Sequence, residues 1–322
     1  MSVAAPDLRQ FARTLFSTAV DAADPALALF SALKQHPLPE PGPGGRSLLI
    51  AIGKAAPSMM TAALSHVSGP RTALCITHAG NTATCADATM FYAAHPVPDE
   101  TGLAAGQAVI DMLNNAGPED RVIALISGGG SALVPAPSPG LQLSDKIAVN
   151  AALLASGLDI VAMNTVRQQL SQLKGGGLTR LAAPAPVTGY LLSDVIGDDL
   201  RAIASGPTVA PIGTPQQVCS ILKSAGIWDD LPASVREHLT NAKTPADQGI
   251  AVNHLIGSNG QSLRATAKAA APHFQTRIVD DHLTGDVVEA AGTIYETARA
   301  LPPTAPPTAL LWGGDAVASK SE

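Results

Sequence analysis

A run of glycines in this sequence has the composition of an anion-binding turn. Ser127–Ser131 holds three consecutive glycines between two serines, directly after the apolar stretch Val122–Ile126. Glycine reaches backbone conformations closed to other residues and lets bulky ligand groups approach the main chain. The amides of such a turn can bind phosphate or carboxylate oxygens. We therefore predict that Ser127, Gly128, Gly129, Gly130 and Ser131 contact an anionic ligand. A tight strand–helix turn that needs glycine for packing is the alternative.

Two charged residues follow other apolar stretches. Lys54 comes just after Leu48–Ile52, where its ammonium could meet phosphate oxygens as a compact positive charge. A solvent-exposed lysine at a helix start remains the alternative. Asp194 follows the stretch 187–192, where a carboxylate could hold Mg²⁺ or accept a proton from an attacking hydroxyl. Helix capping would explain Asp198 or Asp199 better than Asp194, so we assign the chemical role to Asp194.

A polar and basic stripe forms the third candidate group. Asn164 and Arg167 are three residues apart and Lys174 follows seven residues later. We expect a helix over 159–173 that brings these residues to one face. That face could be directed at an anion, or it could be solvated.

The elements that must position these residues alternate regularly. Short apolar runs end in glycine or polar turns and are followed by sequence with helical periodicity, which is typical of a parallel α/β fold. Ligands of such sheets bind beyond the carboxyl ends of the strands, so we expect Lys54, Asp194 and the glycine turn to converge. The expected strands are 48–52, 73–77, 90–94, 122–126, 187–192, 253–256, 276–279 and 309–312. The expected helices are two within 7–35, then 102–115, 144–156, 159–173, 261–272 and 286–299.

The length of 322 residues allows two domains. The region 229–249 is rich in Pro, Gly and Asp and weakly periodic, which favours a boundary there. We predict a domain over 1–245 and a second, smaller domain over 246–322.

Composition excludes several classes of protein. The net charge of −6 argues against binding to nucleic acid or to anionic membranes. The uncharged stretch 122–144 contains four Gly and three Pro, which is incompatible with a membrane helix. Three cysteines without CxxC spacing favour reduced thiols and a cytoplasmic protein. Neither GxxxxGK[ST] nor GxGxxG occurs, so the common P-loop and dinucleotide fingerprints are absent.

Seven blocks in order over about residues 8–314 resemble one family. They read AADPALAL, AIGKAAPSM, HPVPDETGLAAG, LISGGGSALVPAP, MNTVRQQLSQLKGGGL, LLSDVIGDDLRAIASGPTV and HLIGSNGQSL. The chain resembles the glycerate 2-kinases of the MOFRL type, which are sometimes labelled hydroxypyruvate reductases. The resemblance implies a Rossmann-like first domain, a second α/β domain, and phosphorylation of the 2-hydroxyl of D-glycerate by ATP with Mg²⁺.

The resemblance also implies roles for particular residues. The family's proposed catalytic lysine and aspartate fall on Lys54 and Asp194, with Asp194 as a metal ligand. The glycine turn would hold phosphate or the substrate carboxylate, with Arg167 and Lys174 as supporting cations.

The sequence departs from the family near its end. Trp312–Asp315 begins a Gly-Gly-Glu-Thr-Thr segment that residues 316–322 do not continue, and a family arginine has no counterpart. The resemblance therefore implies an incomplete second domain and reduced phosphoryl transfer, because that reaction needs positioned positive charge. The alternatives are an NAD(P)H-dependent hydroxypyruvate reductase, disfavoured by the absent GxGxxG, and a ligand-binding fragment without turnover.

Overall fold

The computed structural model describes residues 7–244, 249 and 251–317. These residues form two compact units. The smaller unit contains the chain up to Ala28, the short segment Asp194–Asp198, and the chain from Gly257 onward. The larger unit contains Leu29–Ser193 and Asp199–Ile256.

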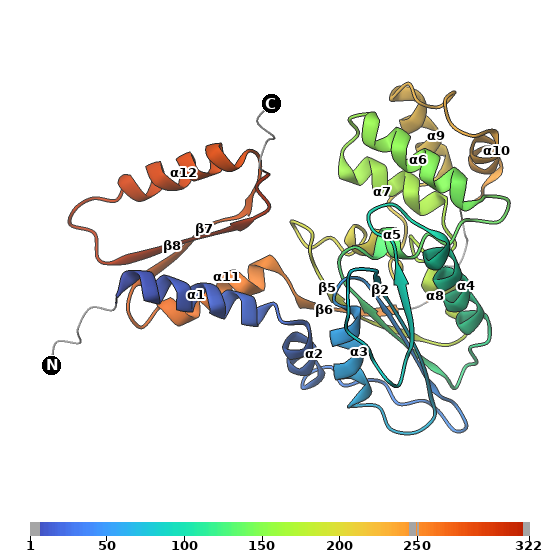
Figure 1. Cartoon of the computed structure of the whole chain (residues 1–322), viewed down its shortest axis with the longest axis horizontal. Coiled ribbons are helices and arrows are strands. Elements are labelled where there is room, and N and C mark those ends of the chain that lie inside the picture. Colours follow the sequence, from blue (N-terminus) through green and yellow to red (C-terminus); the bar gives the residue numbers. More distant parts are fainter. Residues whose placement is uncertain (1–6, 245–248, 250, 318–322) are drawn as a thin grey trace. The chain divides into compact units, whose positions relative to one another are not determined.

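A six-stranded sheet with the order β3-β2-β1-β4-β5-β6 forms the centre of the larger unit (Figure 1). The four pairs from β3 to β5 are parallel, which confirms the predicted α/β class. Ile52 at the end of β1 pairs with Ile126 at the end of β4, so the turns after these strands leave the sheet side by side. The strands are β1 Ser47–Ile52, β2 Arg71–His78, β3 Thr89–Ala93, β4 Arg121–Ile126, β5 Val187–Leu192 and β6 Ala251–Gly257.

Apolar burial explains why these strands form. All six residues of β1 are buried, and so are five of the six residues of β4, as expected for central strands covered on both faces. The helices of this unit are α2 Pro25–Leu33, which begins in the smaller unit, α3 Ala56–Leu64, α4 Glu100–Asn114, α5 Gly130–Leu133, α6 Leu143–Ala155, α7 Ile160–Gln169, α8 Gly177–Ala182, α9 Pro215–Ser224 and α10 Ala233–Asn241.

Four of these helices, α6, α7, α9 and α10, gather at one end of the larger unit (Figure 1). They share an apolar cluster that includes Leu153, Val166, Leu222 and Leu239, each at most 1% exposed. The weakly periodic region 229–249 predicts a domain boundary, and α10 within it is a helix that its sequence pattern does not predict. Val235 and Leu239 are its buried residues, and two apolar positions are too few to produce a clear helical period.

The smaller unit holds α1 Leu8–Ala22, α11 Asn259–Ala270, β7 Gln275–Leu283, α12 Val287–Arg299 and β8 Thr308–Gly314. Strands β7 and β8 form a parallel pair. The ring of Phe11 in α1 packs on His273 and Phe274, with centroid separations of 5.2 and 5.3 Å. This contact places α1 with the C-terminal elements, whereas the predicted domain over 1–245 placed it with the large sheet. None of the described helices has the length and apolar character needed to cross a membrane.

Candidate functional site

The glycine turn is bonded directly to the turn that follows β1. The backbone N–H of Ser127 donates to Ile52 O at 2.9 Å, and the N–H of Lys54 donates to Gly128 O at 2.9 Å. The Ser127 hydroxyl accepts from the N–H of Ala55 at 3.1 Å. Parallel register between β1 and β4 therefore fixes two chemically distinct turns against each other, one rich in glycine and one carrying a lysine.

The side chain of Lys54 runs along the glycine turn. Gly129 has a φ of +83°, which favours glycine, and a Cβ added there would lie 3.2 and 3.3 Å from Lys54 Cγ and Cε. The same Cβ would lie 3.4 Å from His95 Cδ2. Lys54 itself is exposed, while Gly128 and Gly130 are buried. The structure thus brings Lys54 and the glycine turn together.

The amides of the turn are available as donors. Within the described residues, the backbone N–H groups of Gly128, Gly129, Gly130 and Ser131 donate no hydrogen bond to the protein. Buried backbone amides normally have a partner in the protein, in water or in a ligand. Successive free amides beside a lysine therefore fit a group with several anionic oxygens, such as a phosphate.

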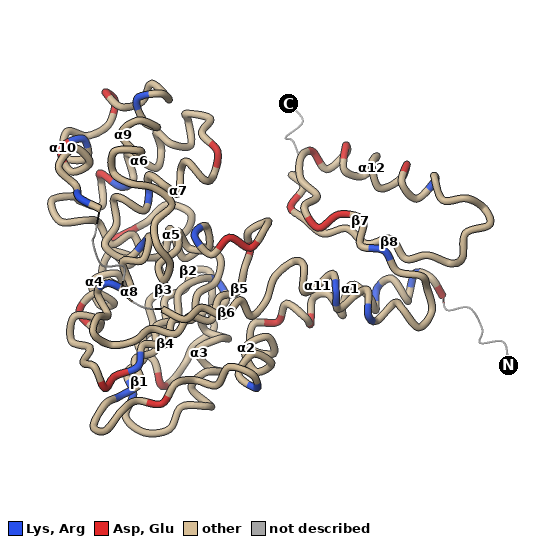
Figure 2. The backbone as a smooth tube through the Cα atoms, turned by 180° about the vertical axis from the view of Figure 1, so that it is seen from behind, with Lys and Arg blue, Asp and Glu red and all other residues tan. Residues whose placement is uncertain are grey.

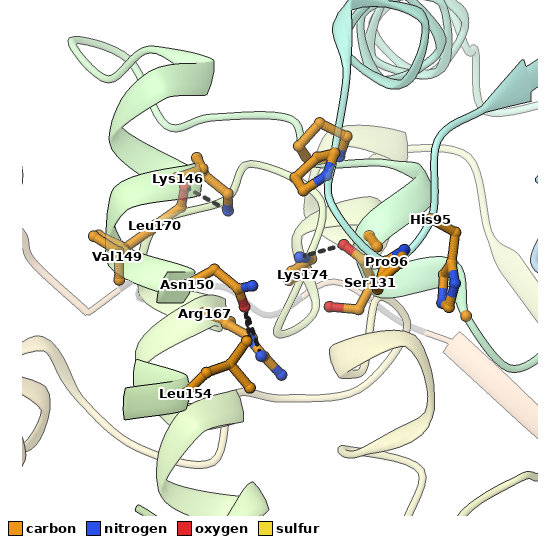
Figure 3. A pocket seen from close by; sticks show the side chains of 14 residues that line it. His95, Pro96, Ser131, Lys146, Val149, Asn150, Leu154, Arg167, Leu170 and Lys174 are labelled. Atoms are coloured by element: carbon orange, nitrogen blue, oxygen red, sulfur yellow. Dashed lines mark hydrogen bonds between the residues drawn. The ribbon is translucent and has the colours of Figure 1, made fainter. Parts of the chain in front are cut away.

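A pocket of about 240 Å³ opens beside this turn within the larger unit (Figure 3). Its polar lining residues are His95, Ser131, Lys146, Asn150, Arg167 and Lys174, and Gly129 also borders it. Figure 3 shows the residues of α6 and α7 on one side of the pocket, and on the other His95 and Pro96, which follow β3, together with Ser131 in α5.

Two of the predicted cations reach this pocket. Lys174 is 5% exposed, and its Nζ donates to Ser131 O at 2.7 Å. Arg167 donates from Nη2 and Nε to Asn150 Oδ1 at 2.6 and 3.2 Å, and from Nη1 to Asn164 Oδ1 at 3.4 Å. Asn164 is not among the pocket-lining residues, and it also accepts from the Ser205 hydroxyl at 3.2 Å. Asn164 therefore holds Arg167 in place.

The predicted helix over 159–173 was too long. Helix α7 ends at Gln169, and Lys174 follows it in a separate turn. The backbone after α7 is bonded to a neighbouring segment instead of to the helix, since the N–H of Gln172 donates to Ala136 O at 2.9 Å and the N–H of Ser138 donates to Leu170 O at 3.1 Å. Lys174 thus lines the same pocket as Arg167 because of tertiary contacts of the segment after α7, and not because of helical spacing.

Lys146 is a site residue that the sequence analysis missed. It lies on α6, is 8% exposed, and donates from Nζ to Leu170 O at 3.1 Å. Val149 and Leu153, three and seven residues further, are also buried. A lysine in register with core positions of an amphipathic helix was the signal that could have found it.

Burial changes the ionisation of the three cations. Desolvation, assisted by the positive charge of Arg167, lowers the pKa of Lys146 to about 7. Desolvation lowers the pKa of Lys174 well below its usual value, with further lowering from Lys146 and Arg167. Desolvation also lowers the pKa of Arg167. The pocket is therefore a place where positive charge is costly unless an anion is bound.

Asp194 lies two residues after β5 and is exposed. It belongs to the smaller unit, whereas Lys54 and the glycine turn belong to the larger one, and its convergence with them stays a prediction. Nearby Asp199 is engaged locally, because its carboxylate pairs with Arg201 at 2.8 Å. Hydrogen bonds from the Arg201 side chain are the main cause that lowers the pKa of Asp199.

In the described part of the chain, one group of three side chains could together hold a metal ion. It consists of Asp280, Asp281 and His282 at the acidic end of β7 (Figure 2). His282 Nδ1 lies 2.6 Å from Asp281 Oδ1. Asp194, the predicted Mg²⁺ ligand, offers a single carboxylate, and Mg²⁺ is commonly held by one or two carboxylates together with substrate phosphates.

Comparison with known proteins identifies relatives along the whole chain. A family model described as a domain of unknown function, DUF4147, matches residues 11–240. The glycerate 2-kinase of Pyrococcus horikoshii is 33% identical in an alignment of 329 residues, gaps included, that covers 97% of this chain and 74% of that protein. The crystal structure of a glycerate kinase from Thermotoga maritima superposes with a TM-score of 0.86 at 30% identity and covers 97% of this chain and 75% of that one.

Other relatives match a shorter part of their own length. An Agrobacterium vitis protein whose name refers to hydroxypyruvate reductase is 40% identical over 177 residues. The match covers 54% of this chain and spans only 39% of that relative.

Proposed function

Because the chain belongs to the DUF4147 family, and its relatives include glycerate 2-kinases, we propose that it transfers a phosphoryl group from ATP to the 2-hydroxyl of D-glycerate. The observation that carries this proposal is the free-amide turn Gly128–Ser131 with the Lys54 side chain along it. Both lie beyond the carboxyl ends of parallel strands β1 and β4, where ligands of such sheets bind.

In this proposal the turn and Lys54 hold the phosphates of the nucleotide. The amides donate to phosphate oxygens, and the Lys54 ammonium offsets the negative charge that develops as the phosphoryl group moves. The fit is supported by the shape of the turn, because a side chain at position 129 would occupy the space beside Lys54. Ser127 acts indirectly, since its hydroxyl accepts from the Ala55 amide and fixes the turn that carries Lys54.

Asp194 is proposed as the residue that handles the acceptor hydroxyl. The 2-hydroxyl oxygen forms a bond to the γ-phosphorus, the bond between that phosphorus and ADP breaks, and the Asp194 carboxylate accepts the hydroxyl proton. Mg²⁺ would supply charge neutralisation at the phosphates, and holding that ion is the alternative role proposed for Asp194. Asn164, Arg167 and Lys174 complete the site as an anion-binding group.

We place the reaction in the cytoplasm, because Cys75, Cys85 and Cys219 are all free thiols and disulfides are rare there. Burial, assisted by Cys85, raises the pKa of Cys75 to about 12, so this thiol is unreactive. The proposed reaction needs no thiol.

The proposal is tested by incubating the protein with ATP, Mg²⁺ and D-glycerate while ADP release and 2-phosphoglycerate formation are followed. We expect Lys54→Met and Asp194→Asn to lower kcat by about 100-fold or more. Lys34→Met, an exposed lysine of the larger unit, is the matched control and should leave the rate unchanged. ADP release that does not depend on D-glycerate would refute the substrate assignment.

A second arm tests the reductase named among the relatives. NADH oxidation with hydroxypyruvate, in the absence of ATP, would favour that activity over the kinase. A third outcome is thermal stabilisation by ATP or D-glycerate without product, which would leave ligand binding and remove the proposed catalysis.

A further inference from the structure

The pocket beside the glycine turn contains three cations and no acidic side chain. Lys146, Arg167 and Lys174 line it, and none of its lining residues is Asp or Glu. The ion pairs of the described residues include none of these three cations. Their protein partners are neutral oxygens of carbonyl and amide groups.

Such an arrangement is unfavourable in an empty protein. A buried ammonium without a counter-ion costs free energy, which the group reduces by releasing its proton. The nearest carboxylate along the chain, Asp145, is occupied, because it accepts from the N–H of Gln142 at 2.8 Å and from the Ser234 hydroxyl at 3.0 Å. No carboxylate lines the pocket, so a bound anion would supply the negative charge that stabilises the protonated form of Lys146.

The geometry of Lys146 leaves donors for that ligand. Among the described residues Lys146 Nζ donates one hydrogen bond, to Leu170 O, and a protonated amine has three N–H donors. Lys146 and Arg167 enter the pocket from adjacent helices α6 and α7, and Lys174 enters beside Ser131 (Figure 3). Three cations approaching from different elements suit an oxyanion with more than one oxygen.

The size of the pocket limits the ligand. A volume of about 240 Å³ is below the usual range for a drug-sized ligand, so it suits a small organic acid better than a whole nucleotide. Apolar side chains, among them Val149, Leu154 and Leu170, line the rest of it, and Leu154 is 65% exposed. Lys146 and Lys174 are 8% and 5% exposed, and this burial strengthens their attraction to a bound anion.

We propose that Lys146, with Arg167 and Lys174, binds the carboxylate of the acceptor substrate and selects hydroxy acids against neutral polyols. This inference rests on the proposed kinase function and adds Lys146 to it as a substrate-binding residue. The nucleotide phosphates remain with Lys54 and the turn amides. Lys146 therefore affects the affinity for the acid and not the affinity for the nucleotide.

Binding of the acid also takes up a proton. The groups that face Lys146 are Arg167 from α7, Lys174 from the following turn and His95 from the segment after β3; Asp145 on its own helix is engaged as described. Without ligand Lys146 has a pKa of about 7, so near pH 8 its amine is neutral in most molecules of the protein. A carboxylate favours the charged form, so binding at that pH protonates Lys146.

Isothermal titration of the full chain with D-glycerate, glycerol, inorganic phosphate and ATP–Mg²⁺ tests the proposal. We expect Lys146→Met to weaken D-glycerate binding about 10- to 100-fold and to leave ATP–Mg²⁺ affinity unchanged. Lys34→Met is the control and should change neither affinity. Lys146→Met removes a buried ionisable group and shortens the unbranched side chain by one heavy atom, so the fold is expected to persist.

A second readout separates ligand contact from a structural role. Titrations near pH 8 in two buffers with different ionisation enthalpies measure proton uptake. Arginine stays charged throughout this range, so Lys146→Arg should bind D-glycerate with less proton uptake than the original protein. Equal proton uptake in both proteins would overturn the assignment of the proton to Lys146.

Further outcomes contradict the proposal in distinguishable ways. Unchanged D-glycerate affinity in Lys146→Met would overturn the subsite while leaving the kinase proposal standing. A weakened ATP–Mg²⁺ affinity with unchanged D-glycerate affinity would show that the pocket binds phosphoryl oxygens instead. Equal affinity of the original protein for glycerol and D-glycerate would overturn carboxylate selection. Binding of inorganic phosphate through Lys146, with no binding of D-glycerate, would refute the carboxylate assignment and count against the kinase proposal as well.

Discussion

Replacement of Gly129 by alanine is a sharp perturbation of the candidate site. Gly129 has a φ of +83°, and an L side chain in the left-handed region costs about 1–2 kcal/mol. The new Cβ would also lie 3.2 to 3.4 Å from atoms of Lys54 and His95. Flexible side chains relieve such contacts by moving a few tenths of an ångström, so the main effect beyond the backbone cost is a small shift of Lys54 relative to the turn.

The matched control is Gly140→Ala. Gly140 has a φ of +85° and no heavy atom within 4 Å of an added Cβ. Both variants should therefore lose about 1–2 kcal/mol of unfolding free energy for the same backbone reason. Only Gly129→Ala should weaken ATP–Mg²⁺ binding, about tenfold, because its methyl group lies between the turn and the Lys54 side chain and shifts the ammonium relative to the free amides.

Urea unfolding measures the first effect, and isothermal titration with ATP–Mg²⁺ measures the second. Equal nucleotide affinity in the two variants would refute the argument that Lys54 and the turn act as one phosphate site. Equal loss of affinity in Gly140→Ala would show that the effect arises from lowered stability and not from local geometry.

Three further predictions concern individual side chains. Burial lowers the pKa of Lys146 in the folded state to about 7, so between pH 7 and 10.5 the unfolded state binds more protons at this residue than the folded state. The unfolding free energy of the ligand-free protein should therefore rise with pH in this window, by up to about 5 kcal/mol from Lys146. Urea unfolding at several pH values measures this rise, which should be smaller in Lys146→Met. Asp199→Asn should leave turnover unchanged and lower the unfolding free energy by less than about 1 kcal/mol, because an exposed pair with Arg201 contributes little. Asp194→Asn should lower kcat by about 100-fold or more, and assays of both variants side by side check this. Arg167→Lys should raise the KM for D-glycerate about tenfold, because lysine cannot keep the planar donor geometry that its asparagine partners orient, and a KM unchanged from that of the original protein would contradict it.

The architecture of the sheet could be predicted from the sequence because each strand and the turn after it are defined by residues that are close together in the chain. Buried strands such as β1 and β4 are unbroken apolar runs that end in glycine or polar turns, and parallel order brings those turns to one edge. This rule places Lys54 next to the glycine turn, and the hydrogen bond from the Lys54 amide to Gly128 O confirms that the two turns are in contact.

Other features depend on contacts that sequence patterns do not encode. Helix α7 ends at Gln169 because the backbone beyond it bonds to the segment around Ala136. The sequence does not distinguish Lys146 from an ordinary helix lysine, because its burial in a pocket arises from the packing of α6 against α7. Helix α1 joins the C-terminal elements through Phe11, a pairing between the two ends of the chain that no local period predicts. The roles of Asp194 and of Mg²⁺ stay predictions.

Backbone amide chemical shifts test the central claim most directly. In a ¹⁵N-labelled sample, addition of a non-hydrolysable ATP analogue with Mg²⁺ should shift the resonances of Gly128, Gly129, Gly130 and Ser131, because their N–H groups donate hydrogen bonds to phosphate oxygens. Lys54→Met should reduce these shifts at the same nucleotide concentration. Nucleotide binding that leaves these four amides unchanged and perturbs other parts of the chain would contradict the assignment of this turn as the phosphate site.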